Sequence, residues 1–149
     1  MKEEEFRTNH SLIIEYYQYI ELRLKGICAA ITADGDKGWI ERLDDYEGDP
    51  LGKLLKELLK VQKQQGREYI KIEEIRQLDI LRERRNYWCH QCFGGNESHL
   101  YIKKGEVLPD ITAKEVKEDL NEAVFWDEKL TEFYRCISQE KRIAETIDF

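Results

Sequence analysis

Residues 13–31 read I-I-E-Y-Y-Q-Y-I-E-L-R-L-K-G-I-C-A-A-I, and this stretch decides the fold class. Its bulky apolar residues recur at steps of three and four: Ile13, Tyr17, Ile20, Leu24, Ile27 and Ile31. An α-helix turns once every 3.6 residues or so, about the mean of those steps, and they place these side chains along one face. The pattern predicts an amphipathic α-helix from about residue 9 to residue 31, ended by the D-G-D segment at 34–36.

Three further stretches carry the same period. Residues 51–66 follow Asp49-Pro50, a typical helix start, and end at Gly66, a typical C-terminal cap. Residues 72–93 form the next stretch, and the last begins at Thr112, which matches a capping box with Glu115. With a short helical turn near 39–43, the 149 residues predict one domain, 1–149, folded as an all-α, antiparallel four- to five-helix bundle.

The charge balance restricts the partners that we expect. Lysine and arginine number 24 against 31 acidic residues, which gives a net charge of −7. Indiscriminate binding to nucleic acid or to an anionic membrane needs a positive field, so this balance argues against both. Mean hydropathy is −0.70, and no apolar run approaches the length of a membrane span. Residues 1–5 lack the apolar core of a signal peptide, so the expected location is the cytoplasm, without a membrane partner.

The stretch at 72–93 contains the residues that suggest chemistry. Arg85 falls inside its apolar stripe, where a guanidinium is costly unless it is paired, and Asn86 and His90 lie on the flank. A histidine can transfer a proton near neutral pH, and a guanidinium can hold a phosphate. With the ribose 2′-hydroxyl as nucleophile, this set suits RNA cleavage without a metal or another cofactor. The alternative is structural: Arg85 pairs with a buried acid of another helix, and His90 only packs.

The hexapeptide Arg85-Asn86-Tyr87-Trp88-Cys89-His90 resembles the R-x(4–6)-H motif of HEPN domains, in its R-N-x-x-x-H form. The resemblance implies that Arg85 and His90 form a catalytic pair supported by Asn86, and that two copies meet in a homodimer to complete one active site. Many HEPN proteins are RNases of toxin–antitoxin and phage-defence systems, which implies an RNA substrate and an antitoxin or other regulatory protein as a further partner.

Two features of the family keep an alternative open. Members that are silenced by adenylylation carry a tyrosine two residues after the histidine, where this chain has Cys92, so control of that kind is in doubt. Several HEPN proteins lack nuclease activity and bind a protein or RNA instead, and a non-catalytic module is therefore the second hypothesis.

Cys89 and Cys92 form a C-x-x-C pair, which can be half of a zinc site that His99 and Cys136 would complete. A second clustered pair is absent from the sequence, and the thioredoxin-like context of a redox pair is missing as well. Both cysteines lie on the apolar face of the predicted helix. We therefore expect no metal, with both thiols acting as small hydrophobic groups.

Basic residues near the motif offer a phosphate-binding patch. Arg82 and Arg84 precede Arg85 on the same helix, and Lys103 and Lys104 follow in the next loop. The alternative is a solvated face paired with Glu83 and other acids. The stretch 97–111 is long for a connection in a small domain, and the pattern at 99–102 is too brief to decide whether it contains a strand.

Overall fold

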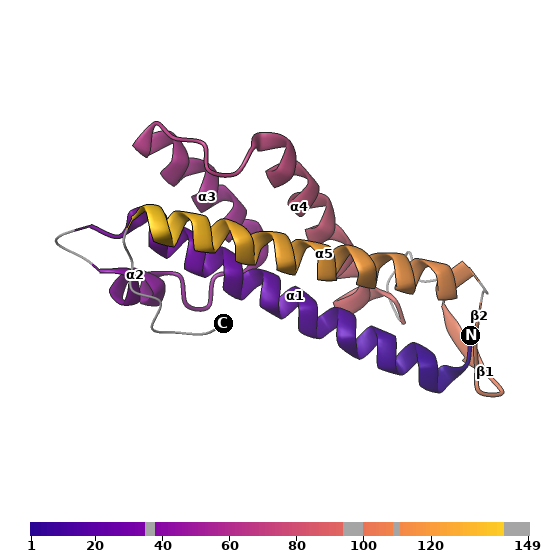
Figure 1. The fold of residues 1–149 in the computed structure, drawn as a ribbon. Helices are drawn as coiled ribbons and strands as arrows, with labels where there is room; N and C mark the ends of the chain where they lie inside the picture. Colours follow the sequence, from indigo (N-terminus) through magenta and orange to yellow (C-terminus); the bar gives the residue numbers. More distant parts are fainter. Residues whose placement is uncertain (35–37, 94–99, 109–110, 142–149) are drawn as a thin grey trace.

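The computed structural model describes residues 1–34, 38–93, 100–108 and 111–141. In chain order the elements are α1 (Glu3–Thr32), α2 (Trp39–Asp45), α3 (Leu51–Gln65), α4 (Ile72–Asn86), the π-helical turn η1 (Tyr87–Gln91), β1 (Tyr101–Lys103), β2 (Glu106–Leu108) and α5 (Ile111–Glu140). The predicted all-α helical bundle is confirmed (Figure 1).

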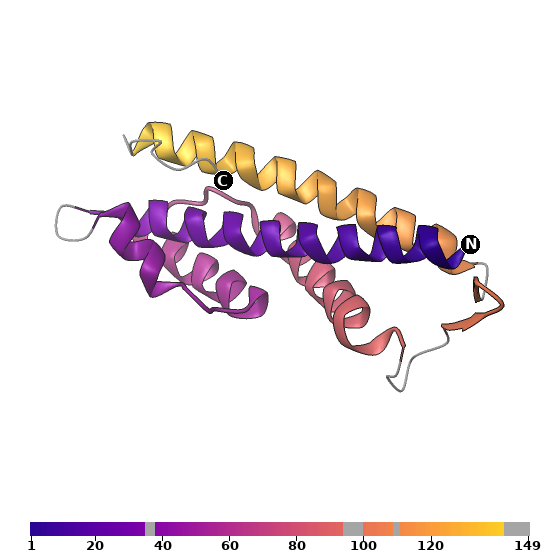
Figure 2. The same cartoon turned by 90° about the horizontal axis from the view of Figure 1, so that it is seen from below.

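The two longest helices, α1 and α5, lie side by side and run in the same direction (Figure 2). Their ion pairs follow the same order along both helices, from Lys117 with Glu5 at 3.3 Å to Arg23 with Asp127 at 3.1 Å. Strict up-and-down alternation would have made the first and last of four helices antiparallel. The chain departs from that alternation because α2 lies between α1 and α3 as an additional short element.

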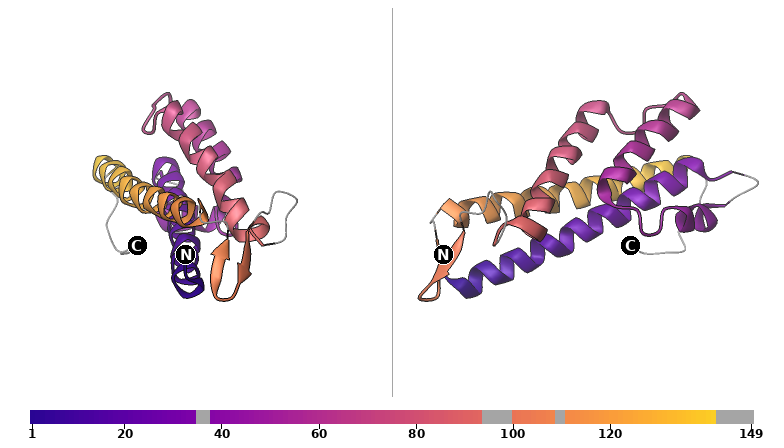
Figure 3. Two further views of the ribbon diagram at one scale, coloured as in Figure 1. Left: turned by 90° about the vertical axis from the view of Figure 1, so that its right-hand side faces the viewer. Right: turned by 180° about the vertical axis from the view of Figure 1, so that it is seen from behind.

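Helix α4 runs against α5, since Glu74 near its start pairs with Lys129, whereas Arg84 near its end pairs with Asp119. Helices α3 and α4 form an outer pair that projects from the α1–α5 pair (Figure 3). This arrangement brings the end of α4, which carries Arg85, against the middle of α1.

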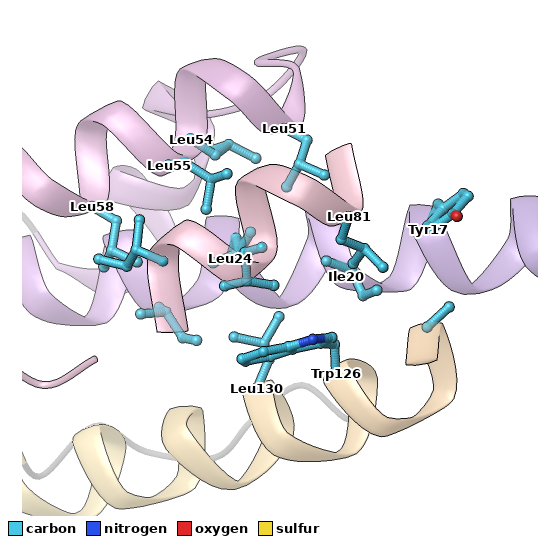
Figure 4. Close-up of a cluster of buried hydrophobic side chains, with 14 of the residues drawn as sticks. Tyr17, Ile20, Leu24, Leu51, Leu54, Leu55, Leu58, Leu81, Trp126 and Leu130 are labelled. Carbon is cyan, nitrogen blue, oxygen red and sulfur yellow. The ribbon is translucent and has the colours of Figure 1, made fainter. Parts of the chain in front are cut away.

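The core lies where α1, α3, α4 and α5 meet (Figure 4). Its contributors from the predicted stripe of α1 are all nearly or fully buried: Ile13, Tyr17, Ile20, Leu24, Ile27 and Ile31. Leu54 and Leu58 of α3, Leu81 of α4 and Trp126 of α5 complete the contacts. Burial of a large apolar side chain contributes about 1.5–3 kcal/mol relative to exposure, so this shared core fixes the position of α4.

The helix ends match the sequence pattern in part. Gly66 adopts the left-handed conformation (φ 65°) that closes α3, as predicted. Helix α1 begins at Glu3, six residues earlier than expected, and ends at Thr32, before the D-G-D segment; residues 35–37 lie outside the described part. Thr112 lies inside α5, which begins at Ile111, so the predicted capping position is wrong.

A two-stranded hairpin precedes α5. Lys104 and Gly105 both have positive φ, 52° and 74°, as a two-residue type I′ turn requires. The start of the chain extends this sheet, because the Glu3 amide donates to the Gly105 carbonyl (2.8 Å) and the Val107 amide to the Met1 carbonyl (2.9 Å). The hairpin is thereby held at the first turn of α1.

Candidate functional site

The hexapeptide motif straddles a change of helix type. Arg85 and Asn86 end α4, whereas His90 lies in the π-helical turn η1, which is closed by the Cys92 amide donating to the Tyr87 carbonyl at 2.8 Å. Sequence periodicity predicts one α-helix through to Phe93 and misses this turn. π turns inside helices occur frequently at functional sites, and this one ends α4, a position where π turns also occur as helix terminations.

The wider turn changes where His90 lies relative to Arg85. Five residues of a regular α-helix rotate through roughly 500°, which would leave the two side chains about 140° apart around the axis. A π turn bonds residue i to residue i+5, so fewer degrees separate successive residues and this angle decreases. The π turn therefore moves His90 toward the side of the helix that carries Arg85.

Arg85 is held by an acid of another helix. Its Nη2 lies 2.8 Å from Oε1 of Glu21 on α1, and its Nη1 donates to Oδ1 of Asn86 at 3.5 Å. Both members of the ion pair are mostly buried, with 25% of the Arg85 side chain and 16% of the Glu21 side chain exposed. The pair places an acid of another helix against the guanidinium, as the structural alternative expected. Sequence spacing could not identify Glu21, because a contact between distant helices leaves no local periodicity.

His90 is in a different state. Its side chain is exposed, and it makes no hydrogen bond or ion pair within the part of the chain that the structure describes. Cys89 beside it is partly buried and lies near the charges of Arg85 and Glu21. The imidazole of His90 is therefore available to an incoming ligand, whereas the guanidinium of Arg85 is held by Glu21.

Arg84 belongs to a separate, closed network. Its Nε donates to Oδ2 of Asp119 at 2.8 Å, and the same oxygen accepts from the indole N–H of Trp88 at 2.6 Å. The guanidinium also lies over the Tyr87 ring, 4.9 Å from its centroid. Burial lowers the pKa of Arg84, but the bond to Asp119 and the negative charges of Asp119 and Glu115 together outweigh it, so the pKa lies above its ordinary value. Arg84 therefore contributes to the contact between the end of α4 and α5.

A buried hydroxyl lies close to that network. Tyr17 is 1% exposed, and its hydroxyl has no hydrogen-bond partner among the described residues. Burial, followed by the negative charge of Asp119, raises the pKa of Tyr17 well above its usual range. The phenol therefore stays neutral, and Tyr17 is one of the core residues.

The predicted basic patch does not assemble around Arg85. Arg82 pairs with Asp79 at 2.8 Å on its own helix, and its stem packs on Gly52 of α3. Lys103 and Lys104 lie in the hairpin, which is held at Glu3, whereas the partner of Arg85 lies eighteen residues further along α1. At about 1.5 Å per residue, roughly 27 Å of helix separates the two positions.

His10 of α1 supports the π turn and escaped the sequence prediction. Its Nε2 lies 2.8 Å from the Trp88 carbonyl, and because a carbonyl only accepts, this nitrogen carries the proton. The ring stacks on Phe6 with centroids 5.6 Å apart, and Cys92 Sγ is 3.8 Å from Nε2. Its position four residues after Phe6 continues the apolar stripe of α1 toward the N-terminus, and this spacing could have indicated that His10 faces the core.

The cysteines are all free thiols. Burial raises the pKa of both Cys89 and Cys92, which keeps both thiols protonated. Cys136 is exposed on α5, near Glu132, and His99 lies outside the described residues. Among the residues that are described, no three His, Cys, Asp or Glu side chains gather in an arrangement that could hold a metal ion.

None of the described helices combines the length and the apolar character needed to cross a membrane. The chain matches no protein-family model, no curated protein and no solved structure. The resemblance to HEPN domains therefore stands on the hexapeptide and its helical setting.

Proposed function

We propose that this chain is a metal-independent endoribonuclease of the HEPN type, with Arg85 and His90 as its catalytic pair. The observation that carries the proposal is the π turn, which lets an exposed, unoccupied His90 approach the side of a fixed Arg85. A proton-transfer group with open space and a cation of defined orientation are the two elements that phosphodiester cleavage needs.

The reaction uses the substrate's own nucleophile. The ribose 2′-oxygen attacks the adjacent phosphorus, and the bond from phosphorus to the 5′-oxygen breaks. A histidine takes the proton of the 2′-hydroxyl or gives one to the leaving 5′-oxygen, while Arg85 offsets the negative charge that develops on the phosphate. Asn86 helps to orient Arg85 through its side-chain oxygen. The products are a 2′,3′-cyclic phosphate, which can open to a 3′-phosphate, and a 5′-hydroxyl.

A homodimer completes the site in this proposal. One histidine cannot serve as base and acid at the same time, and a two-fold contact near η1 supplies a second copy. Phe93, which follows the motif, is 50% exposed although it packs edge-on against Phe6 at 5.9 Å. An exposed aromatic ring three residues after His90 suits such a contact. Light scattering at micromolar concentration tests the dimer, and a monomer would contradict this part of the proposal.

The biological role that we propose is a cytoplasmic toxin or phage-defence component, restrained by an antitoxin or another regulatory protein. Its support is the family resemblance of the hexapeptide, together with a net charge of −7 that disfavours general RNA binding. Toxicity of the expressed chain to its host, relieved by the His90→Ala change, would support this role.

The second candidate is a non-catalytic HEPN module that binds a protein or RNA. The observation in its favour is Glu21, which already occupies the guanidinium of Arg85 at 2.8 Å. A phosphate that approaches Arg85 must share the cation with this carboxylate, and the repulsion weakens the binding of the substrate. In this reading the pair of charges fixes α4 against α1 and takes no part in chemistry.

One experiment separates the two candidates. Purified protein is incubated with a labelled single-stranded RNA in the presence of EDTA, and the same mixtures are run on denaturing and native gels. Cleavage that leaves 2′,3′-cyclic or 3′-phosphate ends supports the enzyme. Intact RNA that is retarded on the native gel supports the binding module and contradicts the nuclease. RNA that is neither cut nor retarded contradicts both RNA functions.

A further inference from the structure

A groove of about 580 Å³ runs between α3 and α4, away from the Arg85–His90 site. Its floor is apolar and buried, with Leu55 and Ile75 each 4% exposed. Leu59 of α3 and Ile72 of α4 form its walls and remain 39% and 41% exposed. Apolar side chains of this size usually pack against something, so an open row of them marks a contact surface.

The groove has the form that receives a helix. Its lining residues recur on α3 at Gly52, Leu55, Lys56 and Leu59 and on α4 at Ile72, Ile75, Arg76 and Asp79. Both sets have the spacing i, i+3, i+4, i+7, so each helix presents one straight stripe to the groove. A third helix placed between two such stripes would meet side chains at its own helical period.

The width of the groove is fixed by the turn that joins its two helices. Gln62 of α3 donates to the Ile70 carbonyl at 3.1 Å and accepts from the Ile70 amide at 2.8 Å. At the other end, Gly52 lets the stem of Arg82 lie on α3, since a Cβ there would be 3.1 Å from Arg82 Cδ. The two stripes are therefore held in place before any partner arrives, which lowers the cost of binding.

The rim of the groove has the opposite charge to the whole chain. Lys53, Lys56, Arg76 and Arg82 line it with Asp79 as the only acid, although the net charge of the protein is −7. Lys53 and Arg82 pair with Asp49 and Asp79, while Lys56 and Arg76 are exposed and have no ion pair among the described residues. Two free cations beside an apolar floor favour a partner that is both acidic and amphipathic.

We infer that this groove binds an acidic amphipathic α-helix of another protein. Apolar residues of that helix fill the row over Leu55, Leu59 and Ile75, and acidic residues beside them face Lys56 and Arg76. RNA fits less well, because phosphates gain nothing from an apolar floor. A second copy of this chain also fits less well, because a symmetric contact would place two basic rims against each other.

A second hollow extends the groove past Leu59 and Ile72 to Lys63 and Gly66. From Gly52 to Gly66 the two hollows follow α3 for fourteen residues, or roughly 21 Å. The bound helix should therefore have about four turns, which sets the length of the probe.

The test uses a fluorescein-labelled synthetic helix of about 14 residues with leucine at i, i+3, i+4 and i+7 and glutamate on the flanks. Two comparison peptides have lysine in place of glutamate or the same composition in scrambled order. Fluorescence anisotropy measures the Kd of each for the full chain. We expect micromolar binding of the acidic helix and at least about tenfold weaker binding of the other two, since like charges disfavour the lysine peptide.

The matched variants locate the contact. Lys56→Glu with Arg76→Glu should raise the Kd of the acidic helix by about tenfold or more, and Leu59→Ser should raise it as well. Lys114→Glu, on an exposed lysine of α5, is the control that should leave the Kd unchanged. If the double charge reversal fails to fold by circular dichroism, Lys56→Ala with Arg76→Ala replaces it.

Several results would overturn the inference. The first is a lack of binding by the acidic helix, and the second is equal affinity for wild type and the double variant. Displacement of the helix by single-stranded RNA would assign the surface to nucleic acid instead. Self-association that the double variant abolishes would assign it to a second copy of the chain. None of these measurements depends on RNA cleavage, so they leave the proposed nuclease untouched.

Discussion

Two neighbouring arginines at the end of α4 lie in opposite surroundings. Arg84 faces α5, where it donates to Asp119 and lies over the Tyr87 and Trp88 rings, whereas Arg85 faces α1, where it pairs with Glu21. Equal charge and adjacent position therefore do not give the two arginines equal surroundings. We call the Arg84 side, whose acid is shared with the Trp88 N–H, the closed side, and the Arg85 side, which is followed by the exposed His90, the open side.

The largest expected effect is on the open side. His90→Ala should reduce RNA cleavage by about 10²–10⁴-fold if the imidazole acts as general base or acid. The melting temperature should hardly change, because His90 is exposed and makes no described contact. Gln91→Ala, at the next exposed position of the same turn, is the control and should keep the wild-type rate. Equal rates for His90→Ala and wild type would contradict the mechanism.

Lysine substitutions compare the two arginines directly. Arg85→Lys keeps the charge but loses the planar fork, so cleavage should fall by about 10²–10³-fold while most of the fold is kept. Arg84→Lys should lower stability through its lost bond to Asp119, yet the folded fraction should still cleave RNA. Rates per folded molecule, with the folded fraction measured by circular dichroism, check both. Loss of cleavage in Arg84→Lys together with wild-type cleavage in Arg85→Lys would contradict this assignment of roles.

Loss of the Asp119 contacts on the closed side should lower the free energy of unfolding. Asp119→Ala removes the acceptor of two hydrogen bonds and leaves the Trp88 N–H and the Arg84 guanidinium without it. Hydrogen bonds to charged groups contribute about 1.5–3 kcal/mol each. Because 37% of the Arg84 side chain is exposed and solvent screens its share, we expect a total loss of about 2–3 kcal/mol in urea unfolding.

Asp79→Ala is the matched control for that change. Asp79 pairs with Arg82 at 2.8 Å, as Asp119 does with Arg84, but it lies on the surface, where an ion pair is worth at most about 1 kcal/mol. Similar losses for the two alanine variants would show that the Asp119 network is not special.

The smallest expected effect is a difference in alkylation rate among the four cysteine thiols. Alkylation requires the thiolate, and burial raises the pKa of Cys89 and Cys92 and brings that of Cys28 to about 12. A raised pKa means protonation at pH values below it, so at about pH 8 iodoacetamide should label exposed Cys136 first and Cys28 last. Mass spectrometry over time checks the order, and rapid labelling of Cys28 in folded protein would contradict its burial.

The sequence predicted those parts of the fold that depend on the local spacing of apolar residues or on a single residue's preference. The stripes of the four long helices, the short helix at Trp39 and the cap at Gly66 all follow from spacing or from one residue's conformational preference. The common direction of α1 and α5 does not, because it depends on how the connections cross the bundle. The π turn also escaped, since no residue in Y-W-C-H-Q marks it.

The candidate site was predictable only as a list of residues. The motif named Arg85, Asn86 and His90, and the structure brings these three to one end of α4 and η1. It does not bring Lys103 and Lys104 there, because a hairpin paired with the first residues of α1 holds them elsewhere. Partners such as Glu21 come from helices far away in the sequence, and only the fold reveals them.

The central claim is that the open side of α4 cleaves RNA through the substrate's own 2′-hydroxyl. The most direct measurement uses two versions of one short RNA in EDTA, identical except that the ribose at the wild-type cut position lacks its 2′-hydroxyl in one. We expect cleavage of the all-ribose RNA to a 2′,3′-cyclic phosphate and no cleavage at the modified linkage. Cleavage of both at the same linkage, or 5′-phosphate ends that require added metal, would contradict it.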